Sequence, residues 1–193
     1  AVINITAVND APVATITPAT YSATEQVALT LKNTGLSISD ADAAAGSMTV
    51  TLSVTEGTLT VTAGGSGALV GNSGTSSVTI TGTVAQINNL LNTDGTSTLS
   101  YIDATDTPSA SATLTLLVDD NGNTGGGSLT SSDTAVINIT AVNDAPVATI
   151  TPASYAATEQ VALSLKNNGL AISDVDAAAG SMTVTLSVTE GTL

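Results

Sequence analysis

Acidic side chains occur in pairs at the ends of strand-like runs, and their oxygens are the kind of ligand that binds a hard cation. The formal net charge is −14, with sixteen Asp and Glu residues against two basic residues. Carboxylates gathered in turns repel one another unless a cation neutralises them. Calcium takes about six to eight oxygens from carboxylates, Asn side chains and backbone carbonyls. The sequence therefore predicts calcium binding at its acidic turns, which contain Asp40, Asp42, Asp103, Asp106, Asp119, Asp120, Asp144, Asp174 and Asp176.

An alternative explanation for these residues is local, because Asp and Asn are ordinary turn formers. It is the simpler explanation for any single Asp. For the whole set of acidic turns, with only Lys32 and Lys166 to balance them, we favour the metal.

A second oxygen-rich pair lies on a stiff connector. The run VINIT alternates β-branched residues with polar ones, which is typical of a half-buried strand. Pro146 cannot donate to a strand ladder and pushes Ala145 toward an extended backbone. The strand must therefore leave its sheet at Asn143 and Asp144, which we expect to lie between two sheets.

The chain is built from tandem copies, which are the first feature to look for in a sequence. Residues 135–193 repeat residues 1–59 with six differences, and the second copy begins 134 residues after the first. A unit of that length is a normal size for one domain. We therefore predict three parts: the last strand of an upstream repeat in 1–11, a complete repeat in 12–145, and the N-terminal part of the next repeat in 146–193.

The complete repeat reads as an all-β fold. Apolar residues alternate with Thr and Ser in short runs bounded by Gly, Pro, Asn and Asp. We expect strands in 13–17, 21–23, 27–32, 36–39, 47–62 (two strands joined at Glu56 and Gly57), 76–81, 98–103, 112–119 and 131–142. In the two strands of 47–62, the inward residues should be Val50, Leu52, Val54, Leu59 and Val61.

One segment departs from strand periodicity. In Thr83 to Leu91 the apolar residues follow helical spacing, and Thr83 with Gln86 fits a capping box. We expect one short helix there. The Gly-rich stretch 63–77 should be a loop or hairpin and 119–128 a turn.

Composition excludes several functions. The acidic balance disfavours nucleic acid and anionic membrane as partners, and no run approaches the roughly 20 apolar residues of a membrane span. The chain has no Cys or His to act as base or nucleophile and no Trp or Phe to hold a sugar. We therefore do not expect an enzyme. The absence of Cys also excludes disulfides and says nothing of compartment.

The order of these features resembles a known family. A strand with a lone Glu is followed by a DxD turn, an acidic turn with Gly and a last strand running into NDxP. This order resembles the cadherin repeat, and more closely the cadherin-like and immunoglobulin-like repeats of giant bacterial adhesins of the RTX and biofilm-associated kind. The resemblance covers the whole repeat, and VNDAPV is its most specific part. It implies antiparallel β-sandwiches strung end to end, with calcium at each junction.

The resemblance also implies which residues share a junction. It assigns the downstream junction to Glu25, Asp103 or Asp106, Asn143, Asp144, Asp174 and Asp176, and the upstream one to Asn9, Asp10, Asp40, Asp42 and Asp119 or Asp120. Ala7 and Ala141 replace an Asp of the cadherin connector. We therefore expect one or two ions per junction.

These features together predict a calcium-stiffened spacer of a large, secreted, cell-surface adhesin that holds a distal binding domain away from the cell. Its partners would be the neighbouring repeats of the same chain. Two alternatives remain: a subunit of an extracellular filament or surface layer, with homotypic strand contacts, and a ligand-binding adhesin domain.

Overall fold

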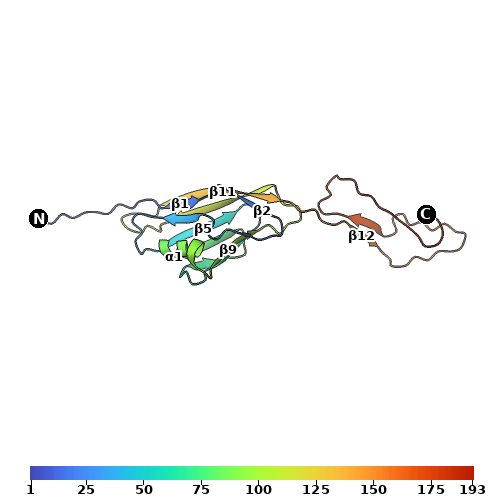
Figure 1. The fold of residues 1–193 in the computed structure, drawn as a ribbon, viewed down its shortest axis with the longest axis horizontal. Helices are drawn as coiled ribbons and strands as arrows, with labels where there is room; N and C mark the ends of the chain where they lie inside the picture. The colour runs from blue at the N-terminus through green and yellow to red at the C-terminus, as the bar shows by residue number, and fades with distance from the viewer. The chain divides into compact units, whose positions relative to one another are not determined.

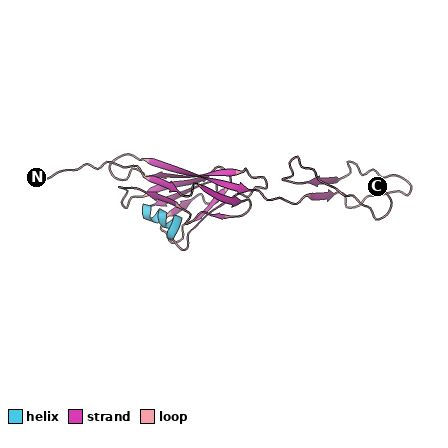
Figure 2. Ribbon diagram, turned by 45° about the horizontal axis from the view of Figure 1, so that its top comes forward, coloured by secondary structure: helices cyan, strands magenta, loops and turns pink.

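The computed structural model describes residues 1–193 and divides them into two compact units, Ala1–Val142 and Asn143–Leu193. Both units are built of strands joined by turns, and one short helical segment lies in the first (Figures 1 and 2). The chain is therefore all-β, as its periodicity predicts. The strands of the first unit are β1 (Val13–Ile16), β2 (Thr20–Thr24), β3 (Leu29–Thr30), β4 (Leu36–Ser39), β5 (Met48–Val54), β6 (Thr58–Thr62), β7 (Leu69–Gly71), β8 (Ser77–Gly82), β9 (Thr98–Ile102), β10 (Ser111–Asp119) and β11 (Thr130–Thr140).

Three sheets form the first unit. The largest has six strands in the order β2-β11-β10-β5-β8-β7, the second has the order β3-β9-β6, and β1 pairs with β4. All pairings are antiparallel except that of β2 with β11, where Ile137 lies opposite Tyr21. The long β11 is therefore held by β10 on one edge and by β2 on the other.

The core follows from strict alternation along the central strands. In β5 every second residue from Met48 to Val54 is buried, and β10 alternates in the same way, as does β11 from Ala135 onward. The buried residues form one aliphatic cluster that includes Tyr101. The five inward residues predicted for the β5–β6 hairpin are all buried, from 0% exposed at Val50, Leu52 and Leu59 to 2% at Val61 and 7% at Val54.

The helical segment begins where the capping box predicts. The side chain of Thr83 accepts a hydrogen bond from the Gln86 amide, and the Gln86 side chain accepts one from the Thr83 amide. The α-helix α1 (Val84–Asn88) continues into a π-helical turn, η1 (Asn89–Thr93). Its apolar face is buried through Ile87, Leu90 and Leu91. The helix is thus fixed by its cap and by burial of one face.

Some predicted boundaries differ from the structure. Only Leu29–Thr30 of the predicted strand 27–32 is a strand, and Val27 is 58% exposed, because the segment pairs with β9 over two residues alone. The apolar pair Leu69-Val70 in the Gly-rich stretch forms β7, which makes a hairpin with β8. Residues 1–11 contain no strand.

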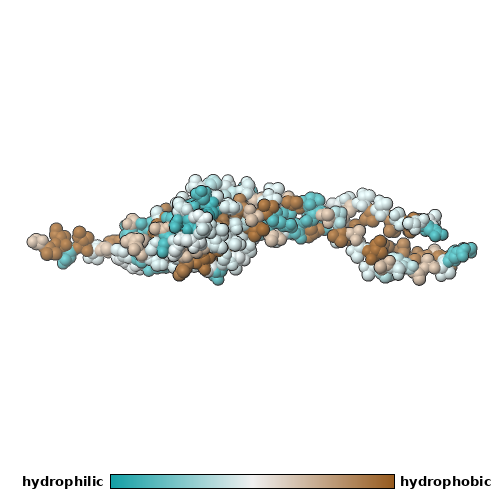
Figure 3. Space-filling model, turned by 60° about the horizontal axis from the view of Figure 1, so that its bottom comes forward, coloured by the Kyte–Doolittle hydropathy of each residue, from teal (hydrophilic) through white to brown (hydrophobic).

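The second unit repeats the sequence of residues 9–59 with six differences, but it forms fewer strands. Its strands are β12 (Val147–Ile150) and β13 (Leu170–Ser173), which pair with the register of β1 and β4. Val184 and Leu186 are 60% and 46% exposed, whereas the identical Val50 and Leu52 are fully buried. Figure 3 shows hydrophobic surface on this unit. The difference arises because residues 143–193 contain no counterparts of β8, β10 and β11.

The chain contains no helix with the length and apolar character needed to cross a membrane.

Replacement of Thr83 by Ala should lower the free energy of unfolding by about 1 kcal/mol, because it removes the side-chain acceptor of the cap. Denaturant titration monitored by circular dichroism would measure the change. Thr83→Ser keeps the hydroxyl and serves as the matched control. Equal losses in the two variants would show that the capping hydrogen bond is not what stabilises α1.

Candidate cation sites at the two ends of the first unit

Candidate ligands gather where the chain enters the first unit and where it leaves it. We call these the entry end and the exit end. Asp120 is bonded to Leu129 just before β11, whereas Glu25 is bonded to Thr140, the last residue of β11. The eleven residues of β11 separate the two groups by about 33 Å, at roughly 3.3 Å per residue. Each end is therefore a separate site.

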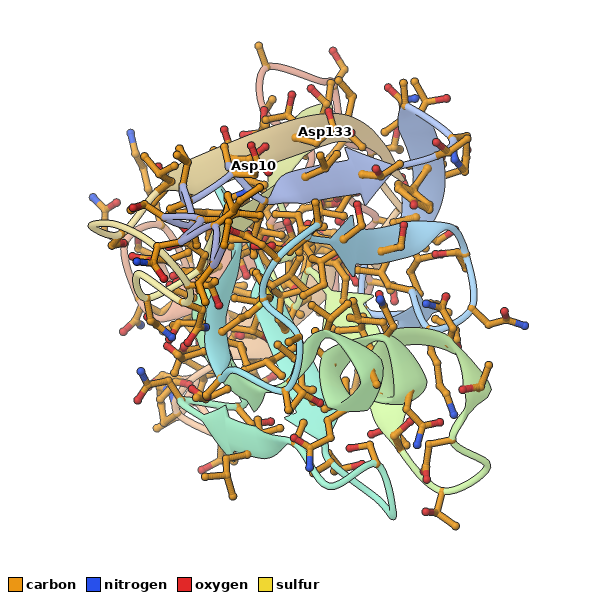
Figure 4. The ribbon with its side chains drawn as sticks, turned by 90° about the vertical axis from the view of Figure 1, so that its left-hand side faces the viewer. Asp10 and Asp133 are labelled. Atoms are coloured by element: carbon orange, nitrogen blue, oxygen red, sulfur yellow. The ribbon has the colours of Figure 1, made fainter.

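The entry end joins the incoming segment to the turn after β4. The Asp10 amide donates to Oδ2 of Asp42 at 3.2 Å. Oδ1 of Asp40 accepts from the amides of Asp42 and Ala43 at 3.0 and 2.9 Å, which is the usual turn-forming use of an Asp. Figure 4 labels Asp10 and looks at the unit from the side where residues 1–10 enter.

Three side-chain oxygens at the entry end have no hydrogen-bond partner. Oδ2 of Asp40, Oδ1 of Asp42 and Oδ1 of Asn9 are buried and accept no hydrogen bond. Burial raises the pKa of Asp42, and the nearby carboxyls of Asp40 and Asp10 raise it further. The turn accounts for Oδ1 of Asp40 and the Asp10 amide accounts for Oδ2 of Asp42, and the other oxygen of each Asp has no partner.

The loop after β10 contributes to the entry end in a different way. Asp120 is fully buried, and both its oxygens are occupied. Oδ1 accepts from the amides of Gly122 and Leu129, both at 2.8 Å, and Oδ2 accepts from Nδ2 of Asn9 at 2.7 Å. Burial alone would raise the pKa of Asp120, but these donors outweigh it and leave the pKa below its ordinary value. Asp120 is thus an anchor of the loop.

Asp119 also stabilises this loop. Its Oδ1 accepts from the Asn121 amide at 2.7 Å and from the Ser128 hydroxyl. Of the two predicted alternatives, neither presents the unpartnered buried oxygen seen in Asp40 and Asp42.

The exit end is organised around Glu25. This residue is 1% exposed, and its Oε1 accepts from the Val142 amide at 2.8 Å. The Glu25 amide donates to the Thr140 carbonyl at 3.0 Å. Oε2 is buried and accepts no hydrogen bond. A glutamate between β2 and β3 thereby binds the segment that leaves β11.

Asp103 shows the same division between its two oxygens. It is 1% exposed, and its Oδ1 accepts from the amide and hydroxyl of Thr105 at 3.0 and 2.8 Å. Its Oδ2 is buried without a partner, and its carbonyl accepts from the Gln26 amide. Asp106 is exposed and bonded to the Gln26 side chain. Of these two alternatives, Asp103 is the one with a buried unsatisfied oxygen.

Two residues of the exit end escaped the sequence analysis. Burial raises the pKa of Tyr101 to about 12, and the charges of Asp103 and Glu56 add to the shift. The Tyr101 hydroxyl is buried without a partner, and Oε1 of Glu56 accepts from the Ser109 amide at 2.9 Å. The sequence signal for Glu56 is a Glu in the turn between two strands, which by itself predicts only a turn.

The remaining predicted ligands lie in the second unit. The Asp144 amide donates to Oδ2 of Asp176 at 3.1 Å, and Oδ1 of Asp174 accepts from the Ala177 amide at 3.0 Å. This repeats the arrangement of Asp10, Asp40 and Asp42. Hydrogen bonding with Asp174 lowers the pKa of Asp176, whereas the pKa of Asp42 is raised. The Asn143 side chain donates to the Asp144 carbonyl.

No cationic side chain supplies the missing charge at these carboxylates. Lys32 donates to the carbonyls of Asp94 and Ser97 in the loop after η1, and Lys166 lies in the second unit. No group of three or more acidic side chains is already arranged to hold a metal ion. The donor set at both ends, carboxylate and amide oxygens with buried unused lone pairs, suits a hard cation.

Comparison with known proteins adds no assignment. No protein-family model matches the chain, and no curated protein matches it.

The lowered pKa of Asp120 predicts acid sensitivity. A depressed pKa adds stability that is present above the ordinary value of 3.8 and is lost as the pH falls through the lowered value. The wild type should therefore exceed Asp120→Asn in free energy of unfolding at pH 5 in chelator, and the gap should narrow below pH 3.8. Urea titrations across this range would measure it. A constant gap would contradict the assignment.

Proposed function

We propose that the chain is part of a calcium-rigidified structural extender, a spacer made of tandem repeats in a large extracellular bacterial adhesin. In this proposal each repeat is an antiparallel β-sandwich of the cadherin-like and immunoglobulin-like kind. The array would hold a distal binding domain away from the cell surface. Calcium at the junctions would stiffen the array.

One observation carries the proposal. Four carboxylates each use one oxygen to fix a backbone amide and keep the other buried without a partner: Glu25 and Asp103 at the exit end, Asp40 and Asp42 at the entry end. A buried oxygen without a donor costs about 1 to 3 kcal/mol, and more when charged. Such a cost is removed if a cation binds there.

Calcium would be held by the chain's own oxygens. At the exit end the ligands would be Oε2 of Glu25 and Oδ2 of Asp103, and at the entry end the free oxygens of Asp40, Asp42 and Asn9. The ion supplies positive charge between carboxylates that otherwise repel. The chain's part is to hold one oxygen of each carboxylate on a backbone amide, so that the other oxygen keeps a fixed position.

The repetition supports a mechanical role over recognition. The two copies differ at six positions, and none of the six is among the proposed ligands. A ligand-binding domain would need a surface unlike that of its neighbours, whereas a spacer works by replication. The aliphatic core and small turns likewise suit a module that is copied many times.

The expected energies are modest and add over many sites. Extracellular calcium modules bind with dissociation constants of about 10⁻⁴ to 10⁻³ M. At about 1 mM calcium, mass action then stabilises the bound form by about 0.4 to about 1.4 kcal/mol per site. A junction with one or two ions would then be biased toward one geometry by about 0.4 to about 2.8 kcal/mol.

Calcium should therefore raise the free energy of unfolding of the first unit, and Asp103→Asn should remove the part contributed by the exit end. In chelator the same variant should be as stable as the wild type or more so, because it removes a buried charge whose Oδ2 has no partner, while the Asn side-chain oxygen can still accept from Thr105. Urea titration with about 1 mM calcium or with chelator would measure both effects, given the expected gain per site.

The matched control is Asp133→Asn, which removes the same charge from β11, where Asp133 accepts from the Ile16 amide and has no unsatisfied buried oxygen. It should keep the full gain from calcium. The proposal fails if calcium does not stabilise the wild type, or if Asp103→Asn responds as fully as Asp133→Asn.

A second candidate, the filament or surface-layer subunit, is favoured by the exposed apolar residues of the second unit. An open apolar groove there is lined by Val147, Ile172, Met182 and Val184. In a filament, another copy of the chain would cover this groove.

Sedimentation over a wide concentration range separates the two candidates. A spacer should remain at its chain mass of 18.7 kDa, whereas a filament subunit should form a concentration-dependent series of larger species. Val184→Ser should abolish that series if the groove is the contact.

A further inference from the structure

The segment that enters the first unit lies against a glycine run in the loop after β10. We define the connector as Ala7–Asp10 and the glycine run as Gly125–Gly127. A Cβ at Gly125 would lie 2.7 Å from the carbonyl carbon and oxygen of Ala7 and 2.9 Å from the Val8 amide nitrogen. These are backbone atoms, so they cannot move aside as a flexible side chain could. Gly125 also has a φ of +94°, which L side chains rarely adopt.

Contact with the connector fades along the run. A Cβ at Gly126 would lie 3.1 Å from Cβ of Asn9, and one at Gly127 would meet no atom within 4 Å. The Gly127 carbonyl instead accepts a hydrogen bond from Nδ2 of Asn9 at 3.0 Å. The loop thus gives the connector a close backbone contact at one glycine and an acceptor at another.

The second acceptor is built into the protein interior. The same Asn9 nitrogen donates to Oδ2 of Asp120 at 2.7 Å. Asp120 is fully buried, and its other oxygen is fixed by the amides of Gly122 and Leu129. Because this carboxylate is already oriented, binding the Asn9 amide requires little further ordering. The Asp10 amide adds a contact to Asp42.

We infer that the loop of residues 119–128 is a docking site for the connector, and that it holds the connector without any metal. Its partner is an extended peptide segment with a backbone that can approach a glycine and an Asn two residues later. The site selects Asn because the side-chain nitrogen donates two hydrogen bonds, one to Asp120 and one to the Gly127 carbonyl. An Asp in this place would set a second carboxylate against Asp120.

In the second copy of the connector, the residue before the Asn makes a contact of its own. The Val142 amide donates to Glu25 of the unit that the chain is leaving. Val142 and Asn143 have the same letters as Val8 and Asn9. In the proposed tandem array, the loop of the following repeat would hold Asn143 as the loop of the first unit holds Asn9, and this step rests on the proposed array.

Backbone order parameters of residues 7–9, measured by ¹⁵N relaxation on the full chain in chelator, test the docking site. In the wild type they should match the core strands, near about 0.85, and in Asn9→Ala and Gly125→Ala they should fall below about 0.6. Gly95→Ala, in the loop after η1, is the matched control, because a Cβ there would meet no atom within 4 Å, and it should behave as the wild type. Because a Cβ at Gly125 also strains the loop, Asn9→Ala, which leaves the loop intact, decides if Gly125→Ala does not fold.

Low order parameters in the wild type, or unchanged ones in Asn9→Ala, would overturn the inference. Since every sample contains chelator, these outcomes say nothing about calcium. Conversely, the calcium titrations with Asp103→Asn report on the exit end and leave the loop untouched. The two ideas therefore fail separately.

Discussion

Negative charge with almost no counter-charge is the constraint on which this structure depends. The fold can bury aliphatic residues along alternating strands, but each carboxylate at a strand end must find donors. The first unit solves half of this problem with its own backbone. Amides of Val142, Thr105, Asp42 and Asp10 each satisfy one oxygen of a buried or half-buried acid. The oxygens left over lie where the chain enters and leaves the unit, so the unsatisfied charge is concentrated at its two ends.

Sequence periodicity was enough to predict most strands of the first unit, the inward residues of the β5–β6 hairpin and the capped helix. Periodicity could not predict that two copies of one sequence would differ, with one copy forming a strand and the other not. Residues 181–188 have the same letters as 47–54, yet they form no strand, whereas 48–54 form the central β5. The alternating pattern supplies a face, and the face is buried only where β8 and β10 pair alongside it. Strand formation here is a property of partners supplied from distant parts of the chain.

The site was predictable in part for the same reason. The acidic pairs are visible in the sequence, but the sequence does not show which oxygen of each Asp accepts a hydrogen bond from a backbone amide. Asp119 with Asp120 and Asp40 with Asp42 are both pairs of Asp in turns. Only their geometry shows that the first pair stabilises a loop and that each member of the second pair has an oxygen without a partner. Tyr101 and Glu56 join the exit end through the pairing of β9 with β6, a long-range register that no local pattern encodes. The role of Gly125 also depends on a segment more than a hundred residues earlier in the chain.

The identity of residues 1–6 with 135–140 matters while the chain is still folding. Both segments read AVINIT, and the second pairs with β2 in the native first unit. The first segment is nearer to β2 along the chain and emerges earlier during synthesis, so it competes for the same strand edge before the correct one exists. Arrays of nearly identical modules carry this hazard of mispairing and domain swapping in general. Fidelity then depends on β10, which pairs with β11 over nine residues and reaches beyond the shared letters to Thr130.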